Sequence, residues 1–150
     1  MLYPWPNGLK NITGNIEGMK KIILIEDDPD LLDILKELLN QEGFEVITYP
    51  DKNSVKRIII NRPDLVLLDN QLTDGLGSRL CREIKSNDLT KDIPVLLISG
   101  DENLASLARE SGADGFLAKP FNIAVLVRMV KKWSGLSHDM PNPDQSPKGY

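Results

Sequence analysis

The chain has 150 residues, of which 41% are apolar and 27% charged, a balance typical of one globular domain with or without tails. Its single cysteine and single histidine exclude an internal disulfide framework, a multi-cysteine zinc site and a two-histidine metal site. Because the net charge is −4 and no apolar run approaches the ~20 residues that span a bilayer, we expect a cytoplasmic protein without membrane insertion and without a direct nucleic-acid partner.

The two ends of the chain lack the periodicity of helices or strands. Residues 1–18 contain two prolines and three glycines, and residues 134–150 contain three prolines and few apolar side chains. Such composition is typical of segments without a packed core. We therefore expect a flexible N-terminal lead over 1–18, one domain over 19–133 and a disordered tail over 134–150.

In chain order, strand and helix patterns alternate five times within the expected domain. The first strand, Ile22–Ile25, precedes the strongest helical pattern, Pro29–Gln41, in which leucine and isoleucine recur at spacings of three and four. Pro29 suits the first turn of this helix, and Gly43 suits its end. The remaining elements are a strand over Phe44–Thr48, a helix over about Asn53–Asn61, a strand over Leu65–Leu68, a helix over about Leu76–Asn87, a strand over Val95–Ile98, a helix over about Glu102–Ser111, a strand over Gly115–Leu117 and a helix over about Asn122–Trp133.

This alternation predicts an α/β fold in which helices cover both faces of a five-stranded parallel sheet. The third and fourth strands are continuously apolar, as strands buried on both faces must be. Ligands of such sheets bind beyond the carboxyl ends of the strands. The residues that follow each strand are therefore the candidates for chemistry.

Polar side chains follow four of the five predicted strands. They are Glu26, Asp27 and Asp28 after the first strand, Asp69 after the third, Ser99 at the end of the fourth and Lys119 after the fifth. Carboxylates that converge at one sheet edge repel by roughly 3 kcal/mol per pair at ~5 Å and an effective dielectric of about 20. A hard divalent cation such as Mg²⁺ offsets this repulsion. Acids, a cation, a hydroxyl and an ammonium together suit phosphoryl transfer, in which a carboxylate is a competent nucleophile.

Four stretches of the chain carry a family resemblance. IILIEDDPDLLDILKELL, PDLVLLDNQLTDGLG, IPVLLISG and GADGFLAKPF follow one another within Lys20–Trp133. In this order the chain resembles the receiver domain of two-component response regulators, of the chemotaxis type. The resemblance implies a doubly wound, flavodoxin-like sheet with strand order 2-1-3-4-5. We also expect a stand-alone receiver, because the last 17 residues are too few for an output domain.

The resemblance assigns a phosphoacceptor and a metal site. Asp69 matches the carboxylate that accepts a phosphoryl group from a phosphohistidine of a sensor histidine kinase or a histidine phosphotransfer protein. Asp27 matches a direct ligand of Mg²⁺ (or Mn²⁺), and Glu26 matches the neighbouring acid that holds the ion through water. The main-chain carbonyl of Gln71 would complete the protein ligands, together with Asp69.

The resemblance also assigns the residues that respond to phosphorylation. Lys119 matches the cation that binds a phosphoryl oxygen, and its bond to Pro120 would be cis. Ser99 matches the hydroxyl that turns toward the phosphate. Phe116 matches the aromatic switch residue, although simple core filling explains it equally well. Thr73 stands where the family usually has proline.

Other residues have plainer interpretations. Asp28 and Asp30 are better explained as the cap and first turn of a helix than as ligands. Cys81 is expected to be a small buried apolar residue. Gly75 and Gly77 are expected to serve turn geometry and a close approach at the start of a helix.

The leading hypothesis is a phosphorelay receiver that catalyses only its own phosphorylation and dephosphorylation, and so is not an enzyme in the usual sense. It would signal to an unidentified downstream protein through the face of its fourth helix, fifth strand and fifth helix. One alternative is an aspartyl-nucleophile phosphatase for small phosphate esters, with Asp28 and Asp30 as its Asp-x-Asp pair. Another alternative is a receiver-like interaction module that is never phosphorylated.

Overall fold

A computed structural model describes residues 18–50, 55–72 and 75–135. The elements are, in chain order, β1 (Lys21–Ile25), α2 (Pro29–Gln41), β2 (Glu45–Tyr49), α3 (Val55–Asn61), β3 (Leu65–Asp69), β4 (Gln71–Leu72), β5 (Gly75–Leu76), α4 (Gly77–Ser86), β6 (Val95–Ser99), α5 (Leu104–Ser111), β7 (Gly115–Ala118) and α6 (Ile123–Ser134). Three of the expectations fall outside the described residues. They concern Thr73, residues 1–17 of the expected lead and residues 136–150 of the expected tail.

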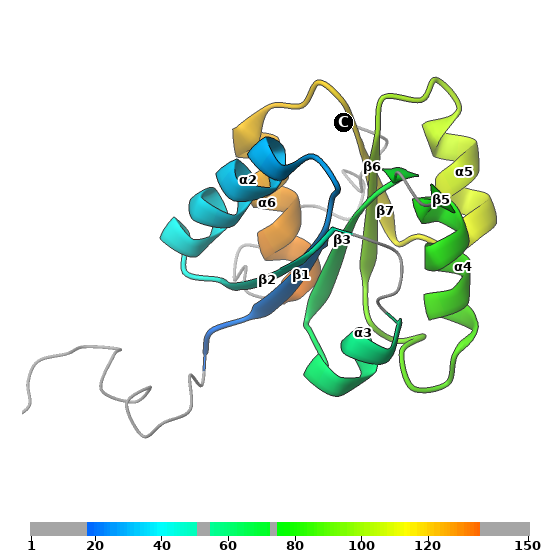
Figure 1. The fold of residues 1–150 in the computed structure, drawn as a ribbon, viewed down its shortest axis with the longest axis horizontal. Coiled ribbons are helices and arrows are strands. Elements are labelled where there is room, and N and C mark those ends of the chain that lie inside the picture. Colours follow the sequence, from blue (N-terminus) through cyan, green and yellow to red (C-terminus); the bar gives the residue numbers. More distant parts are fainter. Residues whose placement is uncertain (1–17, 51–54, 73–74, 136–150) are drawn as a thin grey trace, which may run out of the picture.

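Five parallel strands form the main sheet in the order β2-β1-β3-β6-β7 (Figure 1). Counted over these five strands alone, the order is the expected 2-1-3-4-5. Every residue of the two central strands β3 and β6 is buried, which confirms the interpretation of their unbroken apolar runs. The fold class predicted from the alternation of elements is therefore confirmed.

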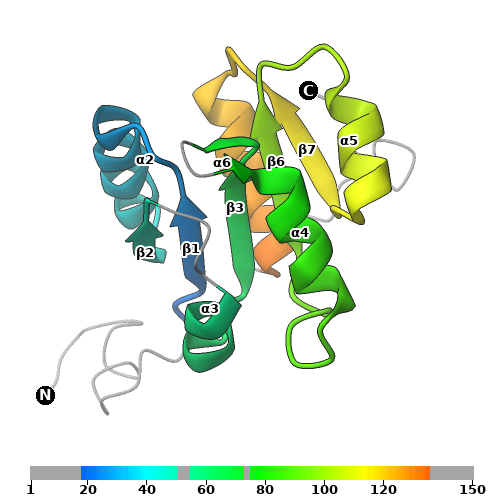
Figure 2. The same cartoon turned by 45° about the vertical axis from the view of Figure 1, so that its right-hand side comes forward.

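Helices cover both faces of this sheet. On one face α2 and α6 pack against the strands, and on the other face α3, α4 and α5 do so (Figures 1 and 2). Each helix contributes buried side chains to its layer, such as Leu39 and Leu126 on the first face and Ile58 and Ile84 on the second. Cys81 of α4 is fully buried in the second layer, as expected for a small apolar residue.

The expected strands and helices are present with bounds within two residues of those expected, as at the second strand, and one further hairpin was not expected. The second strand begins at Glu45 and not at Phe44, which is buried just before it. A short antiparallel hairpin, β4–β5, lies between β3 and α4, and no strand was expected there. Two-residue strands are too short to produce a recognisable alternation.

The start of α2 follows directly from its sequence. The Asp28 carboxylate accepts hydrogen bonds from the backbone N–H groups of Asp30 (3.0 Å) and Leu31 (3.3 Å), and Pro29 occupies the first turn. The helix ends at Gln41, and Gly43 adopts a φ of 96° just beyond it, a conformation that favours glycine. None of the described helices combines the length and the hydropathy that a membrane crossing requires.

Candidate functional site

Three carboxylates gather at the carboxyl edge of the sheet. Glu26, Asp27 and Asp69 each offer an oxygen atom, and these atoms lie within 4.8 Å of one another. The parallel register brings them together, because Ile25 of β1 lies opposite Leu68 of β3 and the acids follow directly. Glu26 and Asp69 are only 4% and 5% exposed. The convergence predicted from the strand ends is therefore present in the structure.

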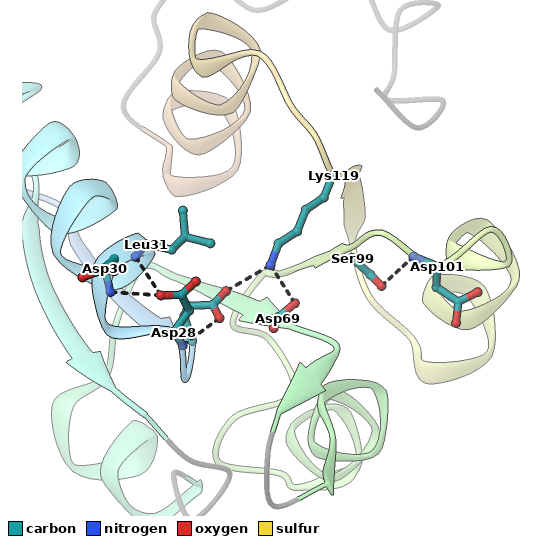
Figure 3. Close-up of polar contacts among 8 residues, drawn as sticks. Asp28, Asp30, Leu31, Asp69, Ser99, Asp101 and Lys119 are labelled. Carbon is teal, nitrogen blue, oxygen red and sulfur yellow. Dashed lines mark hydrogen bonds and ion pairs between the residues drawn. The ribbon is translucent and has the colours of Figure 1, made fainter.

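Lys119 connects two of these acids. Its ammonium nitrogen lies 3.2 Å from Glu26 Oε2 and 3.3 Å from Asp69 Oδ1, and Figure 3 shows the side chain extending across the edge of the sheet toward Asp69. The backbone N–H of Lys119 donates to the Ser99 carbonyl at 2.8 Å, which holds the end of β7 beside β6. The Lys119–Pro120 bond is cis, as the resemblance implied.

The electrostatic balance of this cluster favours a further positive charge. Burial raises the pKa of the Glu26 carboxyl, and the nearby Asp69 raises it further, against the opposing effects of Lys119 and the Asp28 N–H. Burial likewise raises the pKa of Asp69, in spite of Lys119 and a hydrogen bond from the backbone of Gln71. The pKa of Lys119 lies above its usual value because Asp69 and Glu26 outweigh the effect of burial. One ammonium offsets one of three carboxylate charges, and a divalent cation with oxygen ligands fits the other two.

Ser99 ends β6 at the same edge and is 1% exposed. Its hydroxyl oxygen accepts a hydrogen bond from the backbone N–H of Asp101 at 3.0 Å (Figure 3). The Asp101 carboxylate in turn accepts a hydrogen bond from the N–H of Asn103 at 2.7 Å. Phe116 of β7 is half-buried and packs against the second hydrophobic layer. Such a position suits both a switch and core filling, so the two interpretations of Phe116 stay open.

Asp28 takes part in the helix cap and lies outside the three-acid cluster. The capping interpretation is thereby confirmed. The Asp-x-Asp pair of the phosphatase alternative starts with this residue, whose carboxylate already accepts two backbone hydrogen bonds. That alternative therefore gains no support from the geometry.

Two residues beyond the carboxylates shape the site. The backbone of Gly77, the first residue of α4, lies so close to β3 that a Cβ atom on it would stand 2.1 Å from the carbonyl oxygen of Asp69. The expected close approach at Gly77 is thus confirmed. Asn70, which sequence reasoning did not single out, is 2% exposed and its side chain accepts a hydrogen bond from the Ser78 N–H. No sequence signal distinguishes Asn70, because its burial and its bond to Ser78 appear only in the folded chain.

Comparison with known proteins identifies the family. The sequence model described as the response regulator receiver domain matches residues 22–131. The chain belongs to this receiver domain family. The transcriptional regulatory protein CpxR of Klebsiella pneumoniae subsp. pneumoniae (strain HS11286) is similar to it, with 35% identity over 122 residues, which cover 80% of this chain and 51% of that protein. The chain spans about half the length of the curated relatives it matches.

Solved receiver structures share this fold. A putative response regulator from Chloroflexus aurantiacus J-10-fl superposes with a TM-score of 0.74 at 29% identity, covering 78% of this chain and 98% of that one. The receiver domain of the sensor histidine kinase PA1611 from Pseudomonas aeruginosa PAO1 superposes with a TM-score of 0.72 at 26% identity, covering 78% and 98%. That structure has a magnesium ion coordinated in its active site cleft. In this chain the three-acid cluster of Glu26, Asp27 and Asp69 could hold a metal ion, because its ligand atoms are carboxylate oxygens.

Proposed function

We propose that this receiver domain accepts a phosphoryl group on Asp69 from a phosphohistidine of a sensor histidine kinase or a histidine phosphotransfer protein. The observation that carries the proposal is the cluster of Glu26, Asp27 and Asp69 within 4.8 Å, with Lys119 in contact with two of its members. This arrangement combines a carboxylate nucleophile, oxygen ligands for a cation and a fixed ammonium. Phosphoryl transfer requires little more, since it depends on positioning and charge neutralisation.

The metal site of the proposal consists of Glu26, Asp27, Asp69 and the main-chain carbonyl of Gln71. These are oxygen ligands, which suit Mg²⁺ or Mn²⁺. When bound, the cation supplies positive charge against the acids and the oxygens of the transferring group. Glu26 accepts a hydrogen bond from the Asp28 N–H and forms an ion pair with Lys119. Because both of its carboxylate oxygens already have a partner, Glu26 suits a role in contacting the ion through water.

The Asp69 carboxylate is the proposed nucleophile. One of its oxygens attacks the phosphorus atom, the P–N bond to the donor imidazole breaks, and the imidazole leaves with the electron pair of that bond. Lys119 favours this step because it stabilises the ionised carboxylate that burial disfavours. Its ammonium lies 3.3 Å from Asp69 Oδ1 and can follow the new negative charge to a phosphoryl oxygen. Attack of water on phosphorus, with cleavage of the new P–O bond, returns the domain to its starting state.

The proposed response to phosphorylation involves Ser99 and Phe116. The Ser99 hydroxyl accepts from the Asp101 N–H and retains its own proton, which it can donate to a phosphoryl oxygen. Rotation of this hydroxyl would change the packing beside Phe116. The equilibrium between the inactive and active conformations of the face formed by α5, β7 and α6 would then shift. This face is the proposed binding surface for a downstream protein.

The test uses acetyl phosphate as a small phosphoryl donor in the presence of Mg²⁺. Wild-type protein is expected to take up one phosphoryl group per chain, measured by intact-mass spectrometry or by retarded migration in a phosphate-affinity gel. Asp69→Asn is expected to take up none. Asp28→Asn is the matched control, because it changes a neighbouring acid that caps α2 and keeps an oxygen for the cap.

Undiminished labelling of Asp69→Asn would refute the assignment. Repeated turnover of a small phosphate ester, without accumulation of labelled protein, would instead support the phosphatase alternative. Absence of labelling in the wild-type protein, with either acetyl phosphate or beryllofluoride, would support the unphosphorylated interaction module.

A further inference from the structure

The N-terminus of α4 obtains its cap from outside the helix. Leu76 occupies the N-cap position, and its apolar side chain makes no capping hydrogen bond. Asn70 supplies the acceptors instead. Its carbonyl oxygen accepts from the Gly77 N–H at 2.7 Å, and its side-chain Oδ1 accepts from the Ser78 N–H at 2.8 Å. One residue thus satisfies the first two N–H groups of the helix, which would otherwise lack partners.

Asn70 is itself firmly held in the sheet. Its backbone N–H donates to the Ile98 carbonyl of β6 at 2.9 Å, and the residue is 2% exposed. Ser78, on the other side of the contact, is 5% exposed. A hydrogen bond between two groups so well shielded from water is costly to break, because neither group can turn to solvent.

The segment between the two ends of this contact is the β4–β5 hairpin. Gln71 pairs with Leu76 across it, and in Figure 2 the hairpin lies beyond the carboxyl end of β3, next to the start of α4. Asn70 therefore precedes the hairpin at Gln71 and also binds the residues that follow it, Gly77 and Ser78. The backbone N–H of Gln71 faces the Asp69 carboxylate closely enough to lower the pKa of that group.

We propose that Asn70 is a positioning residue for the phosphoryl-transfer site. By holding the start of α4 against β3, it fixes the direction of the Gln71 peptide groups, one of which faces the Asp69 carboxylate and the next of which carries the carbonyl assigned to the metal. Asn70 contacts neither the metal nor the phosphoryl group in this role. The inference rests on the proposed function for the identity of the ligand, but the contact between Asn70 and α4 can be tested without it.

The first variant is Asn70→Leu, which keeps the size of the side chain and removes its acceptor oxygen. The buried Ser78 N–H then loses its partner, and the start of α4 is held to Asn70 only by the main-chain bond from the Gly77 N–H to the Asn70 carbonyl. Substitution of residues that orient metal ligands typically lowers metal affinity 10–100-fold, and we expect a loss of about tenfold in Mg²⁺ affinity. The affinity is measured by calorimetric titration of the full chain with MgCl₂.

A second readout needs neither metal nor phosphoryl donor. In metal-free wild-type protein, the Gln71 amide proton is expected to show the downfield NMR shift of a donor to a carboxylate. Asn70→Leu is expected to lose this shift, whereas Asn70→Asp, which retains an acceptor oxygen of the same reach, keeps it. Asn87→Ala is the control, since it removes the hydrogen bond from the Leu89 N–H to Asn87 Oδ1 at the other end of the same helix and should change neither readout.

An unchanged Mg²⁺ affinity or an unchanged Gln71 amide signal in Asn70→Leu would overturn the inference. If Asn70→Leu does not fold, Asn70→Ser replaces it, because the serine hydroxyl is one bond too short to reach Ser78 and is expected to produce the same two losses. Failure of the proposed function has a different signature. In that case the wild-type protein remains unlabelled by acetyl phosphate, while the Gln71 signal still responds to the loss of Asn70.

Discussion

Replacement of Gly77 with alanine would push a methyl group into the backbone that carries Asp69. The added Cβ would lie 2.1 Å from the Asp69 carbonyl oxygen and 2.9 Å from the Asn70 Cα. Ordinary contact between carbon and a carbonyl oxygen begins at roughly 3.3 Å. The start of α4 and the end of β3 must therefore separate by about 1 Å. Rotation of a side chain cannot relieve this contact, because both partners are main-chain atoms.

The expected cost follows from this geometry. Overpacking of a well-packed interior costs about 1–3 kcal/mol, and a clash with main-chain atoms belongs at the upper end, near 3 kcal/mol. Alanine recovers at most about 1 kcal/mol, because it favours the helix more than glycine does. The net loss is about 2 kcal/mol in the free energy of unfolding. For a domain of this size, that corresponds to a fall of about 8 °C in Tm.

The assay is thermal unfolding followed by circular dichroism at 222 nm. Gly100→Ala is the matched control, since the nearest atoms to its added Cβ are the Cβ and carbonyl oxygen of Lys119, both at 3.9 Å. This distance is ordinary contact, so the control should keep the wild-type Tm. If Gly77→Ala is as stable as the wild type, or if the two variants lose the same amount, the reasoning from the close approach to Asp69 is wrong.

Three further predictions concern the acidic cluster. Mg²⁺ at about 100 times its Kd should stabilise the wild-type protein by about 2.7 kcal/mol in a thermal-shift assay. EDTA should remove this stabilisation, and Asp27→Asn should not show it. Without metal, burial raises the pKa of Glu26 and Asp69 in the folded protein. The protonated form of each acid therefore stabilises the fold. This contribution to the free energy of unfolding is fully present below the ordinary pKa of the unfolded chain, and it is lost as the pH rises through the raised pKa of the folded protein. Urea titrations from pH 4 to pH 7 should therefore show wild-type stability falling relative to Asp69→Asn, and a constant difference would contradict the burial argument. Lys119→Met should slow labelling by acetyl phosphate about 100-fold, as loss of a charge-stabilising donor does, whereas an unchanged rate would remove Lys119 from the mechanism.

The sequence allowed prediction of those parts of the site that follow from the sheet alone. Parallel strands deliver their final residues to one edge, so the meeting of Glu26, Asp27 and Asp69 could be expected from two short apolar runs. The position of Lys119 followed in the same way. Its specific bond to Glu26 joins residues 93 positions apart, and no local pattern specifies which acid an ammonium will choose.

The parts that were missed depend on tertiary contacts of short segments. The β4–β5 hairpin has two residues in each strand, too few for any periodicity to appear. Asn70 reads in the sequence as an ordinary loop residue after a strand. Its significance arises only when α4 folds back and presents the N–H groups of Gly77 and Ser78 to it.

Chemical trapping of the phosphorylated residue tests the assignment of Asp69 most directly. Wild-type protein is incubated with acetyl phosphate and Mg²⁺, reduced with borohydride, which converts an aspartyl phosphate to homoserine, and mapped by peptide mass spectrometry. Homoserine at position 69, in yield that disappears when EDTA replaces Mg²⁺, is the predicted result. Homoserine at position 27 instead, or a yield at position 69 that is indifferent to the metal, would contradict a metal-dependent phosphoacceptor at the end of β3.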